Sequence, residues 1–160
     1  MMHRPLLYLE TSIFGFYFDT NPHNLHRREA VRTLFDRIEL GILNVVTSPA
    51  TVEELADTPG RYGSDLLGLL AGVAMLELDE VEVKRLASCY MSEQIIPADY
   101  SADARHAAYA TVGRAGIIVT LNLRHLANDW AERRINDVNL REGYPRIGIL
   151  TPEEVLRYEE

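Results

Sequence analysis

The chain alternates short apolar segments with longer amphipathic ones, and this alternation is what most restricts how it can fold. The apolar runs are too short for buried helices. They are continuous rather than alternating, which is typical of strands buried on both faces. The predicted strands are Leu6–Leu9, Ile42–Thr47, Leu76–Leu78, Gly116–Thr120 and Ile147–Leu150. Strands separated by helices predict a three-layer α/β/α sandwich around a mainly parallel sheet.

Helix signals fill the intervals between these strands. Apolar residues recur at helical spacing between Leu25 and Leu40 and between Glu80 and Glu93. Further helices are predicted over 11–18, from Ser48 to a break at Thr58-Pro59-Gly60, from Ser64, from an N-cap at Ser101, around Trp130–Asn136 and after Thr151. Ser48-Pro49 supplies an N-cap with proline at the first helical position, and Thr151-Pro152-Glu153-Glu154 is a capping box.

Length and composition fit one ordinary globular domain over residues 1–160. The chain is 47% apolar and 25% charged, and it has a single cysteine. No apolar run approaches the roughly 18 residues that a membrane span needs, and the first residues lack the pattern of a signal peptide. A lone cysteine excludes an internal disulfide and fits a reducing compartment. We therefore expect a cytoplasmic protein without membrane association.

The net charge of −8 argues against non-specific coating of nucleic acid, which usually needs a basic surface. The charge is uneven, however. Residues 47–82 hold eight acidic residues and one arginine, whereas residues 103–146 hold seven arginines and five acidic residues. A nucleic-acid enzyme with metal-binding carboxylates and a local arginine-bearing face remains compatible with this distribution. Arg124, Arg133 and Arg134 are the candidate phosphate contacts on the basic segment.

Polar residues follow the predicted strands at the places where ligands bind in parallel α/β folds. Glu10 ends the first strand, Glu54 lies early in the helix after the second, Asp103 lies in a first helical turn, and Asn122 follows a later strand. If the strands are parallel neighbours, these side chains converge. Converging carboxylates repel one another unless a cation offsets them, and an all-oxygen site favours Mg²⁺ or Mn²⁺.

The sequence lacks the motifs of several other kinds of active or binding site. The first strand is not followed by the glycine-rich dinucleotide fingerprint, and the chain has neither a P-loop nor a nucleophile elbow. Glu53 stays an alternative to Glu54 at this stage. His106 is interpreted as a packed or hydrogen-bonded histidine, and His125 as a structural or substrate-side residue.

Several motifs, in order, resemble the PIN-domain family of nucleases, and specifically its VapC-like toxin ribonucleases. They are Tyr8-Leu9-Glu10-Thr11-Ser12, Thr51-Val52-Glu53-Glu54-Leu55, Asp103-Ala104-Arg105-His106, the segment from Gly116 to Asn128, the segment from Asn136 to Tyr144, and Thr151-Pro152-Glu153-Glu154-Val155. Together they span nearly the whole chain.

The resemblance implies a metal-dependent ribonuclease that is the toxin half of a bacterial toxin–antitoxin pair and forms a homodimer. It implies that Glu10, Glu54 and Asp103 are metal ligands, that Asn122 stands where many members have a fourth acid, and that Mg²⁺ or Mn²⁺ is the cofactor. Glu10 is one methylene longer than the commoner aspartate, and Asn122 lacks a negative charge. The hydroxyl groups of Thr11, Ser12 and Thr120 are expected to orient the carboxylates or water.

Two rival interpretations remain open. A non-catalytic PIN-like module would keep the fold and bind RNA or a partner protein, and the two departures at Glu10 and Asn122 favour it. A nuclease acting on DNA is the other alternative, because nothing in the sequence selects the sugar. An exposed part of the aromatic run Phe14–Phe18 would suit a dimer or partner interface.

Overall fold

The five strands of the computed structural model form one parallel sheet in the order β3-β2-β1-β4-β5. The structure describes residues 4–57 and 63–159. The strands are β1 (Leu6–Leu9), β2 (Asn44–Thr47), β3 (Ala74–Met75), β4 (Ile117–Val119) and β5 (Gly148–Leu150). In the register of the sheet, Leu7 is paired with Val45 on one side and with Ile117 on the other.

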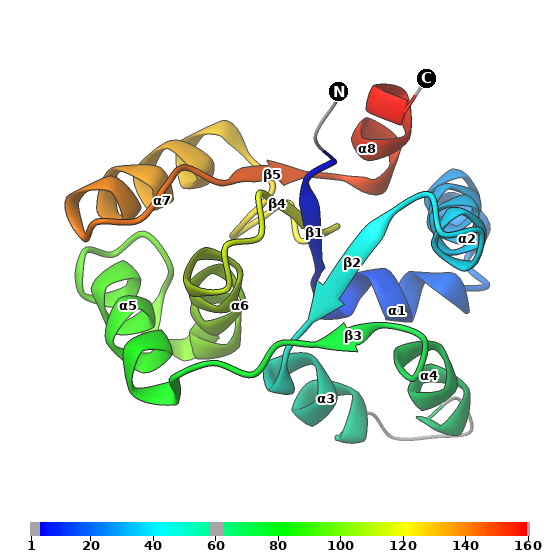
Figure 1. Cartoon of the computed structure of the whole chain (residues 1–160). Coiled ribbons are helices and arrows are strands. Elements are labelled where there is room, and N and C mark those ends of the chain that lie inside the picture. The colour runs from blue at the N-terminus through cyan, green and yellow to red at the C-terminus, as the bar shows by residue number, and fades with distance from the viewer. Residues whose placement is uncertain (1–3, 58–62, 160) are drawn as a thin grey trace.

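Helices cover both faces of this sheet, so the predicted fold class is confirmed. The α-helices of the described residues are α1 (Thr11–Tyr17), α2 (Leu25–Glu39), α3 (Pro49–Ala56), α4 (Gly63–Leu70), α5 (Glu80–Ser92), α6 (Ser101–Val112), α7 (Asp129–Arg141) and α8 (Pro152–Glu159). Short 3₁₀ turns η1 (Pro22–Asn24) and η2 (Ala98–Tyr100) precede α2 and α6. Figure 1 shows α5, α6 and α7 on one side of the strands and α1, α2, α4 and α8 on the other.

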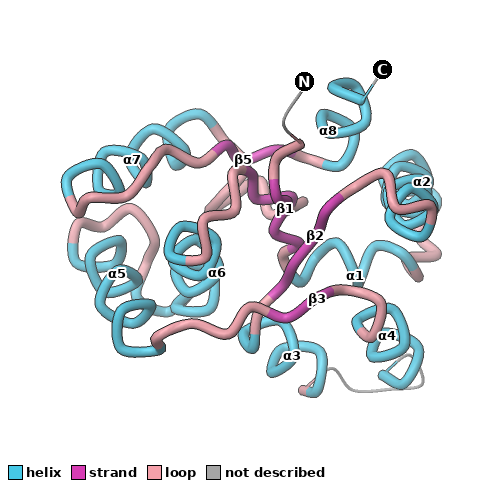
Figure 2. Tube along the Cα trace, viewed as in Figure 1, coloured by secondary structure: helices cyan, strands magenta, loops and turns pink. Residues whose placement is uncertain are grey.

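Alternation along the strands divides the core into two clusters. Tyr8 and Ile118 join the cluster formed with α5, α6 and α7. Leu7, Leu9 and Val119 join the cluster formed with α1, α2, α4 and α8. Successive side chains of a strand point to opposite faces, so both faces of the central strands are dry. The strands accordingly lie in the middle of the molecule in Figure 2, with helices on both sides.

The chain order of the strands reverses beside β1. From β1 the chain goes to β2 and β3 on one side, and later to β4 and β5 on the other. In open α/β sheets, ligands usually bind in the crevice at the carboxyl ends of the strands beside such a switch point. Glu10 directly follows β1 and Thr120 directly follows β4, so both residues lie at this end of the sheet.

Two helix starts were predicted correctly. The Ser48 side chain accepts a hydrogen bond from the backbone N–H of Ala50 at 3.2 Å. In the capping box, Thr151 and Glu154 exchange bonds, with the Glu154 N–H donating to Thr151 Oγ1 at 3.3 Å and the Thr151 N–H donating to Glu154 Oε1 at 3.0 Å. The predicted break at Thr58-Pro59-Gly60 lies outside the described residues.

The predicted N-cap at Ser101 is wrong. Ser101 is the first residue of α6, with helical backbone angles of φ −59° and ψ −29°, and the N-cap position is held by Tyr100 without a side-chain bond. A capping serine needs an extended backbone. The 3₁₀ turn η2 runs directly into α6 here, and this continuity removes the extended residue.

The third strand lies two residues earlier than predicted. Ala74 and Met75 pair with Val46 and Thr47, and β2 ends at Thr47. Leu76 still donates its backbone N–H to the Thr47 carbonyl at 2.9 Å, but the chain then leaves the sheet. Leu76 and Leu78 pack against the core cluster of α5 and α6. Their alternating apolar pattern therefore reflects packing of the loop that leads to α5.

Candidate metal centre

Glu10 is a buried carboxylate at the switch point. Only 5% of its surface is exposed. Its Oε1 accepts hydrogen bonds from the hydroxyls of Ser12 at 2.6 Å and Thr120 at 2.5 Å, and its Oε2 accepts the Ser12 N–H at 3.1 Å. Glu10 is thus also the N-cap of α1. The extra methylene relative to aspartate lets one side chain cap α1 and reach the end of β4.

Glu54 projects from α3 toward Thr11 and His106, at the same end of the sheet as Glu10. Its Oε1 accepts the Thr11 hydroxyl at 2.6 Å and lies 2.5 Å from His106 Nε2. Burial alone would raise the pKa of the Glu54 carboxyl. The hydrogen bonds with His106 and Thr11 and the charges of His106 and Arg105 together outweigh burial, so its pKa lies below its ordinary value. Glu54 is therefore anionic at neutral pH.

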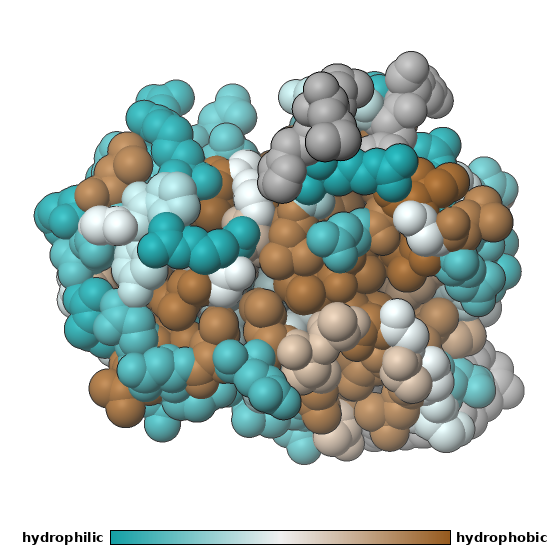
Figure 3. Space-filling view, viewed as in Figure 1, coloured by the Kyte–Doolittle hydropathy of each residue, from teal (hydrophilic) through white to brown (hydrophobic). Residues whose placement is uncertain are grey.

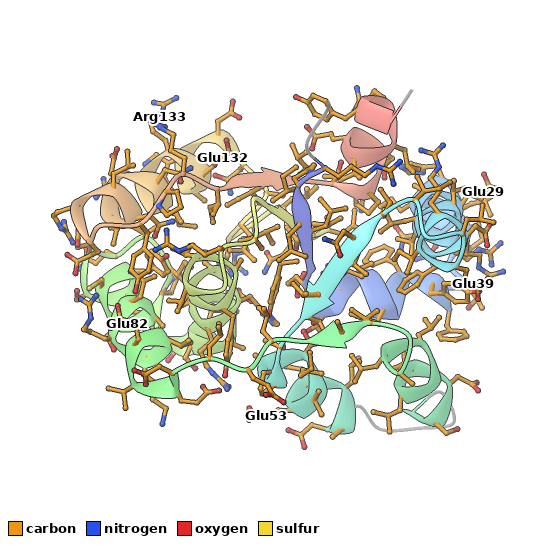
Figure 4. All side chains as sticks on the ribbon, viewed as in Figure 1. Glu29, Glu39, Glu53, Glu82, Glu132 and Arg133 are labelled. Carbon is orange, nitrogen blue, oxygen red and sulfur yellow. The ribbon has the colours of Figure 1, made fainter. Side chains whose placement is uncertain are left out.

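The neighbouring Glu53 takes no part in this cluster. Its side chain is 60% exposed and forms an ion pair with Arg105 at 2.8 Å. A hydrogen bond from the Arg105 guanidinium, and then its charge, hold the pKa of Glu53 below its usual range. Figure 4 shows Glu53 at the outer side of α3. Of the two adjacent glutamates in the sequence motif, the fold thus turns Glu54 inward and Glu53 to solvent.

His106 is fully buried at the back of the cluster and was predicted to be a packed or hydrogen-bonded histidine. Its Nδ1 lies 2.7 Å from the Tyr8 hydroxyl, which in turn lies 2.6 Å from the Ser48 hydroxyl. Its Nε2 faces Glu54 and also lies 3.1 Å from Thr11 Oγ1. Burial raises the pKa of the Tyr8 hydroxyl well above its ordinary value, so this hydroxyl stays protonated.

One ligand atom from each of Glu10, Glu54 and His106 lies within 4.8 Å of the other two. Two carboxylates and an imidazole are a donor set that could hold a divalent cation. The sequence singled out the two glutamates. It gave His106 a structural role, although the spacing from Asp103 to His106, one helical turn, was a signal that this histidine shares the inward face of α6.

Asp103 lies beside a different histidine. Its Oδ2 is 2.8 Å from His125 Nδ1, with 14% of the Asp103 side chain exposed. Asp103 is not among the three residues whose ligand atoms gather within 4.8 Å. The structure thus brings together two of the three carboxylates proposed as ligands. The third, Asp103, lies one turn before His106 on α6 and pairs with His125, from the loop between β4 and α7.

Asn122 is used in the turn after β4. Its side-chain Oδ1 accepts the His125 backbone N–H at 3.1 Å, and its own N–H donates to Thr120 Oγ1 at 2.9 Å. The Leu121 N–H donates to the Ser12 hydroxyl at 2.9 Å, which ties this turn to the start of α1. Each of the hydroxyls of Thr11, Ser12 and Thr120 therefore donates to a carboxylate of the cluster.

The three candidate phosphate contacts lie in different surroundings. Arg124 is exposed, with its guanidinium carbon 5.6 Å from the centre of the Tyr100 ring. Arg134 lies over Trp130 on α7, 5.7 Å from the ring centre. Arg133 points outward from α7, on the opposite side of the view from Glu53 in Figure 4. Arg124 adjoins His125 and so is connected to the Asp103 side of the site.

A cavity of about 670 Å³ opens at the other end of the sheet. It is lined by residues that precede or begin strands, such as Arg4, Asn44 and Gly148, and by apolar side chains including Leu43 and Val155. In Figure 3 apolar surface gathers in the middle of the view, around β1 and β2. The polar cluster is at the carboxyl ends of the strands, so the cavity and the candidate metal centre are separate features.

Comparisons with known proteins support the fold. The crystal structure of FitAcB from Neisseria gonorrhoeae is similar to this chain with a TM-score of 0.54 at 15% identity, over 91% of this chain and 97% of the other. No family model and no curated protein matches the sequence. Within the described residues, no helix has both the length and the apolar character needed to cross a membrane. At this identity the likeness concerns the fold alone.

Proposed function

We propose that this protein is a divalent-metal-dependent endoribonuclease of the PIN-domain family, with a cation held by Glu10 and Glu54. The observation that carries the proposal is the meeting of these two carboxylates, from segments 44 residues apart, with buried His106 at the switch point of the sheet. The motif resemblance and the fold shared with FitAcB support the same conclusion.

The residues present fit a cation. Glu10 accepts three hydrogen bonds, so its carboxylate keeps lone pairs for a metal ion, and Glu54 is held anionic. Asp103, as a third carboxylate, and Asn122, as a carbonyl donor, remain part of the proposed site through the resemblance. Mg²⁺ or Mn²⁺ bound here would offset the charge of a phosphodiester and promote ionisation of a water molecule.

The chain's own groups would fix the geometry of the reaction. Hydroxyls of Ser12 and Thr120 orient Glu10, and that of Thr11 orients Glu54. Second-layer bonds of this kind typically change metal affinity or activity 10–100-fold when removed. Attack by water in line with the leaving 3′ oxygen would yield 5′-phosphate and 3′-hydroxyl ends.

The partners follow from the same proposal. RNA would be the substrate, with Arg124, Arg133 and Arg134 as candidate contacts. An antitoxin protein would bind this chain as the toxin of a bacterial pair, and the chain would act in the cytoplasm as a homodimer. Sedimentation of the purified protein tests the dimer, and a small open reading frame beside the gene would identify a candidate antitoxin.

The test of the proposed activity uses two adjacent glutamates. Purified wild type, Glu54→Gln and Glu53→Gln are incubated with single-stranded and structured RNA, with Mn²⁺ or with a chelator. Cleavage is expected only with metal, at least about 100-fold weaker in Glu54→Gln, and close to wild type in Glu53→Gln. Cleavage that is absent from all three, or equal in all three, would contradict the proposal.

A second candidate function is favoured by one observation. Asn122 stands where many family members have an acid, and its oxygen is already bonded to the His125 N–H. A non-catalytic module that binds RNA or a protein through the same crevice would be compatible with this. RNA binding without metal-dependent cleavage, in the experiment above, would favour the module. Cleavage of DNA in place of RNA would change the substrate and leave the metal centre.

A further inference from the structure

Tyr100 presents an exposed aromatic ring beside the candidate site. The residue ends η2, and 40% of its surface is exposed. Its ring centre lies 4.2 Å from that of His125, with the two planes tilted by 52°. His125 is bonded to Asp103 at 2.8 Å. The exposed ring is thus one side chain removed from a proposed metal ligand, and His125 supports it from behind.

Arg124 supplies a positive charge at the same place. Its guanidinium carbon is 5.6 Å from the Tyr100 ring centre. Arg85, Arg105 and Arg141 each bind a glutamate, whereas none of the ion pairs found among residues 4–57 and 63–159 includes Arg124. An arginine without a carboxylate partner, next to an exposed aromatic ring, can meet an anion from solution.

We propose that Tyr100 and Arg124 form a binding site for one unpaired nucleotide of RNA next to the cleavage position. The base stacks on Tyr100, and Arg124 contacts a neighbouring phosphate. This inference rests on the proposed nuclease function and deepens it, because it makes single-stranded RNA the substrate. Stacking on an aromatic side chain requires a base that is free of its duplex.

The charge of the molecule favours the same substrate. Duplex recognition depends on many basic contacts to two backbones, and a net charge of −8 disfavours recognition of this kind. A nucleotide-binding site made of one aromatic ring and one arginine gains its affinity mainly from base stacking. Stacking tolerates any base and depends less on the net charge of the protein. A loop or an unpaired end of an RNA would therefore enter the site.

The test measures binding without cleavage. A labelled single-stranded RNA and a blunt-ended RNA duplex of the same length are titrated, in a metal chelator, with wild type, Tyr100→Ala, Tyr100→Phe and Tyr158→Ala. Tyr158, on α8, is 79% exposed and serves as the matched control. Tyr100→Ala is expected to weaken binding of the single strand about tenfold, and Tyr100→Phe and Tyr158→Ala to leave it within about twofold. Binding of the duplex should be weaker and should not change in Tyr100→Ala.

Unchanged single-strand binding by Tyr100→Ala overturns the inference, as does an equal loss in Tyr158→Ala. Equal affinity of wild type for a DNA strand of the same sequence overturns the choice of RNA. Thermal melting confirms that each variant is folded. Failure of this inference is distinct from failure of the proposed function, because cleavage with Mn²⁺ is measured separately on wild type. If the protein cleaves RNA but Tyr100→Ala binds it as wild type does, only the nucleotide-binding site is refuted. If binding depends on Tyr100 but no cleavage is found, only the proposed nuclease activity is refuted.

Discussion

Two carboxylate–histidine pairs in the described part of the chain each include one residue of α6. They differ in the burial of the histidine and in the number of its ring nitrogens that have hydrogen-bond partners. His106, paired with Glu54, is fully buried, and both of its ring nitrogens have partners. His125, paired with Asp103 through Nδ1, lies under the exposed ring of Tyr100. No hydrogen bond found among the described residues uses His125 Nε2.

The difference indicates that the two pairs have different roles. A histidine held by Tyr8 on one side and Glu54 on the other has one orientation, which suits a group that positions a carboxylate or a cation. His125 is itself only 8% exposed and is covered by the exposed ring of Tyr100, so it connects Asp103 with that surface ring. The inner pair therefore belongs to the candidate metal centre, and the outer pair connects that centre with the surface.

In the outer pair, the larger loss of activity is expected from the carboxylate. If Asp103 is a metal ligand, Asp103→Asn should lower RNA cleavage by more than about 100-fold, since removal of an outer-layer partner costs only 10–100-fold. His125→Ala should cost about tenfold. Initial cleavage rates of the two variants with Mn²⁺ make the measurement. Equal losses in both variants would mean that Asp103 acts only through His125, and the ligand role would be withdrawn.

The inner pair should matter more for stability. His106→Ala removes one hydrogen-bond partner from each of Tyr8, Thr11 and Glu54 and leaves a buried cavity, at a cost of about 3 kcal/mol. In a chain of this size that corresponds to a melting temperature lower by roughly 6–12 °C, against roughly 2–4 °C for His125→Ala. Thermal unfolding followed by circular dichroism compares the two. A larger drop for His125→Ala would reverse the assignment of inner and outer roles.

Metal binding offers a third comparison, without reference to activity. Mn²⁺ at a hundred times its dissociation constant should stabilise wild type by about 2.7 kcal/mol, which raises the melting temperature by roughly 5–11 °C. Glu54→Gln should abolish most of this increase, and Asp103→Asn should reduce it less. Glu53→Gln is the control and should behave as wild type. An increase that survives in Glu54→Gln would place the cation elsewhere.

The positions of the candidate ligands along the sheet could be predicted from the sequence, because parallel strands bring their carboxyl ends to one edge. The apolar runs before Glu10 and Thr120 were sufficient to identify two of these ends. The choice between Glu53 and Glu54 was not predictable in this way, since it depends on the rotation of α3 about its axis. That rotation is set by burial of Leu55 against the core and by the Arg105 ion pair with Glu53.

The histidine partners depended on contacts between distant segments. Tyr8 and His106 are 98 residues apart, and Asp103 and His125 are 22 apart. The face of α6 that carries Asp103 and His106 could be seen from their spacing. Which histidine would meet which carboxylate depended on the distance between α6 and its neighbours. Ser101 was misassigned for a related reason, because nothing local shows that the turn at Ala98–Tyr100 continues into α6.

The smallest effect concerns a partly exposed carboxylate that pairs with arginine instead of histidine. Hydrogen bonds from Arg85 and Tyr144 lower the pKa of Glu82 from 4.5 to about 2. Because the folded-state pKa is the lower one, the stabilisation is complete above about pH 4.5 and is lost as the pH falls toward 2. Because solvent screens this surface pair, the difference in melting temperature between wild type and Glu82→Gln should be smaller at pH 6 than for either histidine variant, and should shrink by pH 3. A difference that grows on acidification would show that the exposed pair does not follow this linkage. The Glu82–Arg85 pair could then not serve as a control for the Glu54–His106 and Asp103–His125 pairs.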